Sequence, residues 1–218
     1  MPFDVYALDD HDWFSGAEKE LDDYQDALLE ALADSPEGQA QVAAYGDAGF
    51  WTENFVYFGF AYIGVSLPQM TVDDVAEVVE ELFPKKISIL QAEDTKGAVA
   101  ELITLWTYLK RAHGLPQADA ILAYLHDIEP DFPSLMMDSS KFGMAKSFVM
   151  MGQEAGFDMT DEKEASTFIA AYNAAALLAD EQPQRDTPKS SSARATRAKR
   201  RQKRKAEKAA RKKQRGKR

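Results

Sequence analysis

The sequence contains no cysteine among its 218 residues. Disulfide bonds, cysteine nucleophiles, thiolate-bound zinc and iron–sulfur clusters are therefore excluded from the chemistry of this chain. The first residues are acidic and contain no apolar segment, so we expect no secretory signal peptide. Together these absences favour a protein of the reducing cytoplasm.

The sequence also lacks a hydrophobic run long enough to cross a bilayer. No charged residue lies between Glu53 and Asp73, but the continuous apolar stretch extends only from Phe55 to Val65. A helix of this length is too short for the roughly 30 Å of hydrocarbon in a membrane. We therefore predict a buried core helix here and no membrane span.

Positive charge is scarce in most of the chain and concentrated at its end. Residues 1–184 contain 9 Lys and Arg against 34 Asp and Glu, a balance of −25. Residues 185–218 contain 17 Lys and Arg against 2 Asp and Glu, a balance of +15. Such asymmetry is typical of an acidic body that carries a basic interaction tail.

Apolar residues at helical spacing, together with helix-capping residues, predict an all-α fold. Ser15 with Glu18, and Thr71 with Asp74, fit the capping-box pattern of helix starts. Pro84 and Gly114 are expected to end two of the helices. The predicted helices, seven or eight in all, span about 15–33, 35–46, 47–63, 71–83, 94–113, 116–129, 139–155 and 160–180.

The short connections between these helices favour antiparallel neighbours in one globular acidic domain, which we place at residues 1–181. Residues 182–193 are rich in Pro and Ser and are predicted to form a linker. Residues 194–218 contain no aromatic or large aliphatic side chain. Such a segment cannot bury a core, so we expect a disordered tail when it is free.

Three segments are distinctive: MTVDDVAEVVEELFPKKIS at 70–88, LWTYLKRAHGLPQADAIL at 105–122 and DSSKFGMAKSFVMMGQEAGFDMT at 138–160. They resemble a helical protein family of bacteria, notably cyanobacteria, whose members often end in similar Lys- and Arg-rich tails. The resemblance extends from about Leu28 to Asn173. It implies a bacterial cytoplasmic protein and brings no catalytic residue, cofactor or mechanism.

The basic tail is the strongest functional feature, and it predicts non-sequence-specific binding of RNA or DNA through phosphate contacts. It has no aromatic side chain on which single-stranded bases could stack. The predicted nucleic-acid-binding residues are Lys189, Arg194, Arg197, Lys199, Arg200, Arg201, Lys203, Arg204, Lys205, Lys208, Arg211, Lys212, Lys213, Arg215, Lys217 and Arg218.

Other roles for the tail stay open. It could only increase solubility, or it could bind an acidic protein or an anionic membrane surface. Insertion into a membrane is disfavoured, because no apolar face accompanies the positive charge. We also hypothesise that the −25 body competes with nucleic acid for the +15 tail. The linker reach of about 18 Å is similar to the radius of gyration of about 16 Å expected for the body.

The segment from Met136 to Met159 holds six of the eight methionines. Methionine at helical spacing more often belongs to a core, and we adopt this interpretation. The alternative is a partner-binding surface formed by Phe142, Met144, Phe148 and Met151, because methionine surfaces adapt to varied partners. This alternative would make the chain a protein–protein interaction module with an accessory tail. Lys141 and Lys146 are notable only because lysine is rare in the body.

No motif indicates catalysis, so we expect a non-enzymatic protein without a cofactor or a metal. His11 and its neighbouring aspartates lack the spacing of a calcium loop and are read as an exposed acidic terminus. His113 and His126 lie at helix ends, where a cationic side chain suits the helix dipole. The acidic residues Asp73, Glu77 and Glu81 are interpreted as a solvated helix face, since no Glu-x-x-His motif accompanies them.

Overall fold

The computed structural model of the chain describes residues 3–46, 48–89 and 91–179. Within these ranges every regular element is helical and no strand occurs, which confirms the predicted all-α fold class. The chain divides into two compact units, Met1–Met159 and Thr160–Arg218, and each is described by itself. The predicted linker at 182–193 and tail at 194–218 lie outside the described residues, so the predicted domain boundaries stay predictions.

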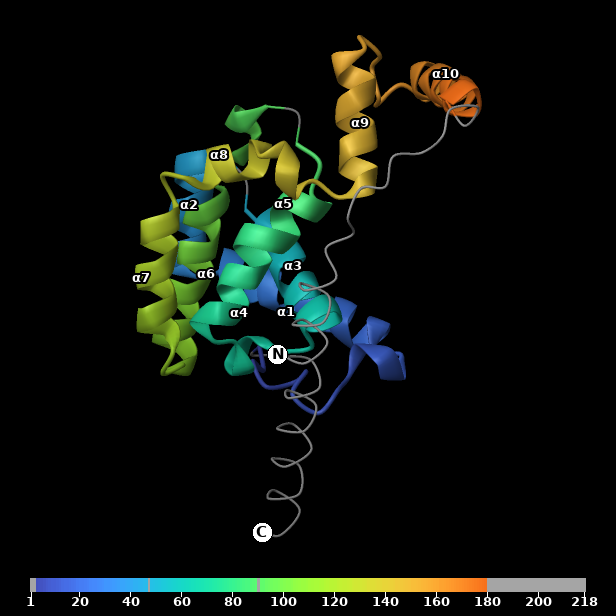
Figure 1. The fold of residues 1–218 in the computed structure, drawn as a ribbon. Coiled ribbons are helices and arrows are strands. Elements are labelled where there is room, and N and C mark those ends of the chain that lie inside the picture. The colour runs from blue at the N-terminus through green and yellow to red at the C-terminus, as the bar shows by residue number, and fades with distance from the viewer. Residues whose placement is uncertain (1–2, 47, 90, 180–218) are drawn as a thin grey trace. The chain divides into compact units, whose positions relative to one another are not determined.

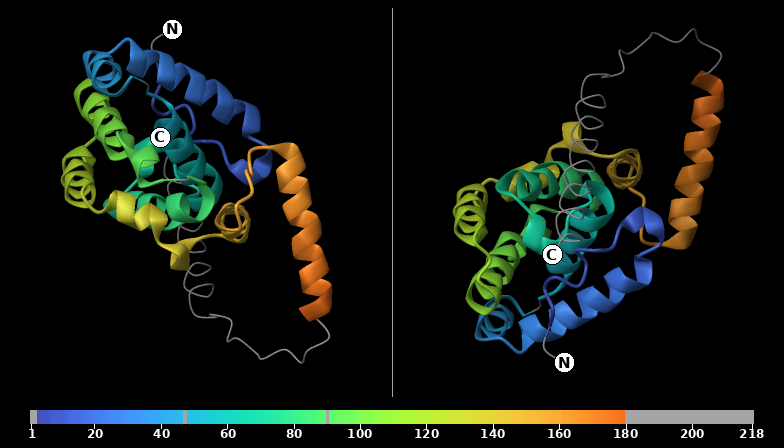
Figure 2. Two further views of the ribbon diagram at one scale, coloured as in Figure 1. Left: turned by 90° about the horizontal axis from the view of Figure 1, so that it is seen from above. Right: turned by 90° about the horizontal axis from the view of Figure 1, so that it is seen from below.

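The first unit consists of α-helices joined by short 3-10 and π-helical segments (Figure 1). Helices α6 and α7 are joined by a short turn and lie side by side (Figure 2), as the short connection between them predicts. In chain order the elements are η1 (Trp13–Ser15), α1 (Glu18–Ala33), α2 (Pro36–Tyr45), α3 (Phe50–Tyr57), η2 (Phe58–Ile63), η3 (Leu67–Gln69), α4 (Val72–Ala76), η4 (Glu77–Leu82), α5 (Phe83–Lys86), η5 (Ala92–Thr95), α6 (Ala98–His113), α7 (Ala118–Ile128), α8 (Phe132–Met137), η6 (Ser139–Lys141) and α9 (Met144–Glu154).

The aromatic segment forms a core helix, as predicted. Helix α3 continues without a break into the π-helical turn η2 and ends at Gly64. Phe55 is completely buried, and Trp51 and Phe60 are nearly so. One face is less covered, since Phe50 is 53% exposed. None of the described helices combines the length and the hydrophobicity that a membrane span requires.

The predicted stop at Pro84 is wrong, because the helix that starts at Val72 runs through the proline to Lys86 as α4, η4 and α5. Proline normally breaks a helix by removing the N–H that bonds the carbonyl four residues earlier. Here that carbonyl belongs to Glu80, and it accepts a hydrogen bond from Lys141 Nζ at 3.0 Å. The helix also widens to π geometry over the turn before Pro84, where the Phe83 N–H bonds the Val78 carbonyl.

Of the two predicted capping boxes, one is confirmed and one is wrong. Thr71 and Asp74 form the reciprocal capping box, and Ser35 caps α2 through its bond from the Gly38 N–H. Ser15, in contrast, is the last residue of η1, which is capped by Asp12. Gly16, in the left-handed conformation, separates η1 from α1. The predicted box of Ser15 and Glu18 therefore does not form.

Three other boundaries differ from the prediction. The segment around 94 forms the short 3-10 helix η5, and α6 begins only at Ala98. The stretch between the predicted helices at 116–129 and 139–155 contains a further helix, α8, with Pro133 in its first turn, where the missing N–H of proline leaves no backbone bond unmade. The segment from Ser139 forms η6, so α9 begins at Met144. The predicted ends of α6 at Gly114 and of α7 before Pro130 are confirmed.

The described helix of the second unit is α10 (Glu162–Ala179). Its start is fixed by Asp161, whose Oδ1 accepts bonds from the backbone N–H groups of Lys163 and Glu164. The prediction placed this start at Thr160. The rings of Phe168 and Tyr172, one helical turn apart, lie 6.2 Å from each other.

Candidate functional site

The sixteen predicted phosphate-binding cations, from Lys189 to Arg218, lie outside the described residues, so this site stays a prediction from the sequence. The other predicted surface is formed by Phe142, which directly follows η6, and by Met144, Phe148 and Met151 of α9, and it can be built from the structure. The segment from Asp138 to Lys146, which we call the α8–α9 corner, holds the start of this surface.

The methionines of this region divide between core and surface. Met136, in α8, is completely buried, as the core interpretation predicts. Met144 is 92% exposed and Met151 is 45% exposed, so the core interpretation is wrong for these two. Met144, Phe148 and Met151 follow one another at the four- and three-residue steps of a single helix face. Phe148 itself is half-buried.

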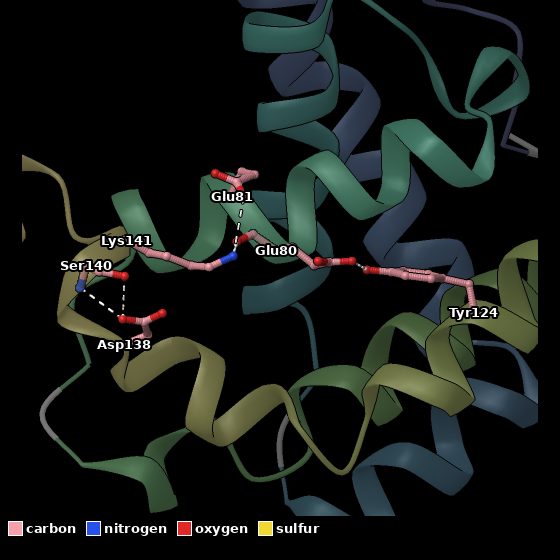
Figure 3. A network of polar contacts seen from close by, with 6 residues as sticks. All are labelled: Glu80, Glu81, Tyr124, Asp138, Ser140 and Lys141. Carbon is pink, nitrogen blue, oxygen red and sulfur yellow. Dashed lines mark hydrogen bonds and ion pairs between the residues drawn. The ribbon is translucent and has the colours of Figure 1, made fainter. Parts of the chain in front are cut away.

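Lys141 connects the α8–α9 corner to the α4–α5 helix (Figure 3). Its Nζ donates to the Glu80 carbonyl at 3.0 Å and lies 3.3 Å from Glu81 Oε1. The first contact replaces the backbone bond that Pro84 cannot make. Lys141 thus performs a structural role that its own sequence position does not reveal.

Two further polar contacts surround this connection (Figure 3). Asp138 Oδ1 accepts bonds from the Ser140 N–H at 2.9 Å and from the Ser140 hydroxyl at 2.7 Å, which lowers the pKa of the Asp138 carboxyl. The Tyr124 hydroxyl of α7 donates to Glu80 Oε1 at 2.9 Å. The pKa of Tyr124 is raised, mainly by burial of the hydroxyl and in addition by this hydrogen bond to a carboxylate. Glu80 therefore links three parts of the first unit.

Lys146 is a buried cation, with only 1% of its surface exposed. Its Nζ donates to the Met136 carbonyl at 2.8 Å and lies 4.1 Å from the centre of the Phe142 ring. None of the ion pairs among the described residues includes it. Loss of hydration on burial lowers the pKa of this ammonium to about 8. Phe142 is consequently occupied by Lys146 and is only partly available to a partner.

Gly143 completes the attachment of the corner. Its N–H donates to the Lys85 carbonyl at 3.2 Å, and a Cβ at this position would lie 2.5 Å from the same oxygen. The corner thus supplies donors to three carbonyls, those of Glu80 in η4, Lys85 in α5 and Met136 in α8. These bonds fix the start of α9, which contacts α5. The arrangement presents an apolar helix face on a base that these hydrogen bonds hold in place.

The histidines differ from their predicted roles in detail. The ring of His113 packs against the rings of Phe3 and Tyr108, at centroid distances of 5.5 and 5.6 Å. Its Nε2 is buried without a hydrogen-bond partner, and desolvation lowers the pKa of the ring. His113 lies in the last turn of α6, as predicted, but its lowered pKa disfavours the cationic form there. His126 is exposed in the last turn of α7.

The N-terminal acidic segment is held more firmly than predicted. Val5 and Leu8 are 1% exposed, and the Val5 carbonyl accepts a bond from the buried Tyr24 hydroxyl. Asp9 accepts a bond from the Ser66 hydroxyl. Of the residues expected in an exposed acidic terminus, Asp10 is exposed, whereas Asp9, His11 and Asp12 are half-buried.

Among the described side chains, no group of three or more His, Asp or Glu is arranged to hold a metal ion. Of the predicted solvated face, Asp73 and Glu81 are exposed, while Glu77 is half-buried.

No protein-family model matches the chain, no curated protein matches it, and no solved structure matches it.

Proposed function

We propose that the chain binds nucleic acid without sequence specificity through residues 189–218, as a non-enzymatic protein of the bacterial cytoplasm. The observation that carries this proposal is the concentration of sixteen Lys and Arg residues against one opposing Glu in that segment. Polyphosphate backbones attract such a segment through release of condensed counterions, and Arg adds bidentate phosphate contacts. The helical body serves as the scaffold that carries it.

The state of the cations in the body supports this assignment to the tail. Among the described residues, Lys19, Lys110, Arg111 and Lys141 form ion pairs with carboxylates, and Lys146 is buried. The carboxylates of residues 1–184 outnumber their cations by 25. A body of this charge repels phosphate, so binding of a polyanion depends on the tail.

The test is titration of labelled RNA and DNA duplexes with the full chain and with a variant lacking residues 189–218. We expect the affinity of the full chain to fall by roughly a thousandfold between about 50 and 200 mM salt, similarly for unrelated sequences. The deletion variant should not bind at any salt concentration. A matched control replaces the tail Lys and Arg by Gln at unchanged length. Equal binding by the deletion variant would show the proposal to be wrong.

A second function is favoured by the exposure of Met144 and Met151 on a fixed helix base. In this proposal α9 binds a protein partner through the face that contains Phe148. The change of Met144 and Met151 to Gln should abolish recovery of the partner, while deletion of residues 189–218 should leave it intact. Val42→Gln, which alters another exposed apolar side chain of the first unit, is the matched control.

A further inference from the structure

A half-open pocket of about 110 Å³ lies where the end of α2 meets the starts of α3 and α6. Three aromatic side chains line it, Tyr45, Phe50 and Trp51, together with the carboxylate of Glu101 and with Lys96. Sites for nucleotides and drug-sized molecules occupy about 300 to 1,000 Å³. The volume here suits one small head group.

The aromatic walls are arranged at right angles. The rings of Phe50 and Trp51 lie 5.3 Å apart with an interplanar angle of 88°. Phe50 is 53% exposed and Tyr45 is 44% exposed, although both are large aromatic side chains. Aromatic faces carry negative electrostatic potential and attract cations, most strongly where water is partly excluded.

The third wall is held in place by a glycine. Gly97 has a φ of +82°, a conformation that side chains rarely adopt, and a Cβ there would lie 2.8 Å from Tyr45 Cδ1. The Tyr45 ring therefore lies directly against the Gly97 backbone. A preformed wall lowers the entropy that must be lost when a ligand binds.

The charges of the pocket favour a cation over an anion. Glu101 is 4% exposed, and its Oε1 accepts the Thr52 N–H at the start of α3, which offsets part of the negative charge. The remaining charge acts at short range, because water is excluded around the buried carboxylate. Lys96 is exposed to solvent, where its opposing charge is screened. In the described part of the chain Lys96 forms no ion pair, and none of the cation–ring contacts involves it. The aromatic faces are thus not occupied by this lysine.

We propose that this pocket binds a trimethylammonium group. The exposed rings of Tyr45 and Phe50 provide the cation–π contacts, the nearly buried Trp51 adds apolar surface, and Glu101 provides the counter-charge. The proposal does not depend on the tail or on α9.

The probe is choline, titrated into the full chain and followed by the amide chemical shifts of Gly97 and Thr52. Its uncharged analogue, in which carbon replaces the nitrogen, should bind at least roughly tenfold more weakly, and acetate should not bind. Tyr45→Ala and Phe50→Ala should each weaken choline binding by about fivefold. Lys96→Gln should tighten it by about twofold, because a repelling charge is removed.

Phe14→Ala is the matched control, since Phe14 is an exposed aromatic of the same unit that does not line the pocket, and it should leave affinity unchanged. Tyr45 and Phe50 are exposed, so their truncation is expected to preserve the fold, which circular dichroism checks. The absence of choline binding would overturn the proposal. Binding of the uncharged analogue as tightly as choline would also overturn the proposal. So would binding of acetate that is weakened by Lys96→Gln, because it would show that the pocket is an anion site.

Discussion

The carboxylate of Glu101, in α6, accepts a hydrogen bond from the backbone N–H of Thr52 at 2.6 Å, in the first turn of α3. Helix α3 begins after Gly49, which has no side chain with which to cap it. The helix start is instead capped by a residue 49 positions later in the chain. Glu101 is 4% exposed, so the free N–H groups and the dipole of α3 provide part of the environment that a buried carboxylate needs.

Substitution of Glu101 tests this cap. Glu101→Ala should lower the free energy of unfolding by about 2–3 kcal/mol, because it leaves a buried N–H without an acceptor. Glu101→Gln keeps an acceptor oxygen and should cost less. Urea denaturation of both variants measures the difference, with Glu93→Ala, an exposed carboxylate of η5, as the control. An alanine variant as stable as the parent would contradict the cap.

The contact between Lys141 and Glu80 leads to a second prediction. Lys141→Met should lower the free energy of unfolding by about 1 kcal/mol, because the Glu80 carbonyl loses the donor that replaces the missing N–H of Pro84. In a Pro84→Ala background the new N–H can serve that carbonyl, so the same substitution should cost less. The double-mutant cycle is measured by urea denaturation. Additive effects of the two substitutions would show that the contact does not compensate for the proline.

A control for this cycle is Lys19→Met. Lys19 forms a solvent-exposed ion pair with Asp23, and such pairs contribute little to stability. Lys19→Met should change the free energy of unfolding only slightly, and by the same amount in the parent chain and in the Pro84→Ala variant.

Local sequence patterns were sufficient to predict contacts between residues that are close to each other in the sequence. Thr71 and Asp74 cap each other three residues apart, and both residue types are visible in the sequence. The passage of the helix through Pro84 was not predictable, because its compensating donor is Lys141, which a sequence pattern does not connect to Glu80. The aromatic pocket was not predictable either, because it joins α2, α3 and α6. Burial of Lys146 likewise depends on Met136 and Phe142 being brought together by the fold.

The buried ammonium of Lys146 predicts a pH dependence of stability. Its pKa is about 8 in the folded chain and about 10.5 when unfolded, so the unfolded chain binds more protons between these values. Stability contributed by this group should therefore rise as the pH increases from about 8 to 10.5, and the penalty below pH 8 is at most about 3 kcal/mol. Lys146→Met should remove this rise in stability and should stabilise the chain at pH 7. The lost hydrogen bond to the Met136 carbonyl reduces this gain by about 1 kcal/mol.

The measurement is the difference in unfolding free energy between parent and Lys146→Met across this pH range. A difference is required because Tyr24 and Tyr124 have raised pKa values, so their ionisation in the unfolded chain lowers stability above about pH 10. Lys85→Met, at an exposed lysine, should keep the rise. A destabilised Lys146→Met variant at pH 7, with the pH dependence unchanged, would contradict the buried-charge argument.

The opposite charges of the body and the tail predict that the body weakens binding of nucleic acid. Residues 1–184 carry −25 and residues 185–218 carry +15, so the body repels the phosphates that the tail attracts. A peptide of residues 185–218 should therefore bind an RNA duplex more tightly than the full chain does at low salt. The difference should shrink as salt rises, because the screening length falls to about 8 Å at physiological ionic strength. Fluorescence anisotropy measures both affinities.

A scrambled peptide of identical composition should bind as tightly as the native one, since the contacts are to phosphates rather than to bases. Binding of the full chain that equals or exceeds that of the peptide at every salt concentration would rule out the repulsion.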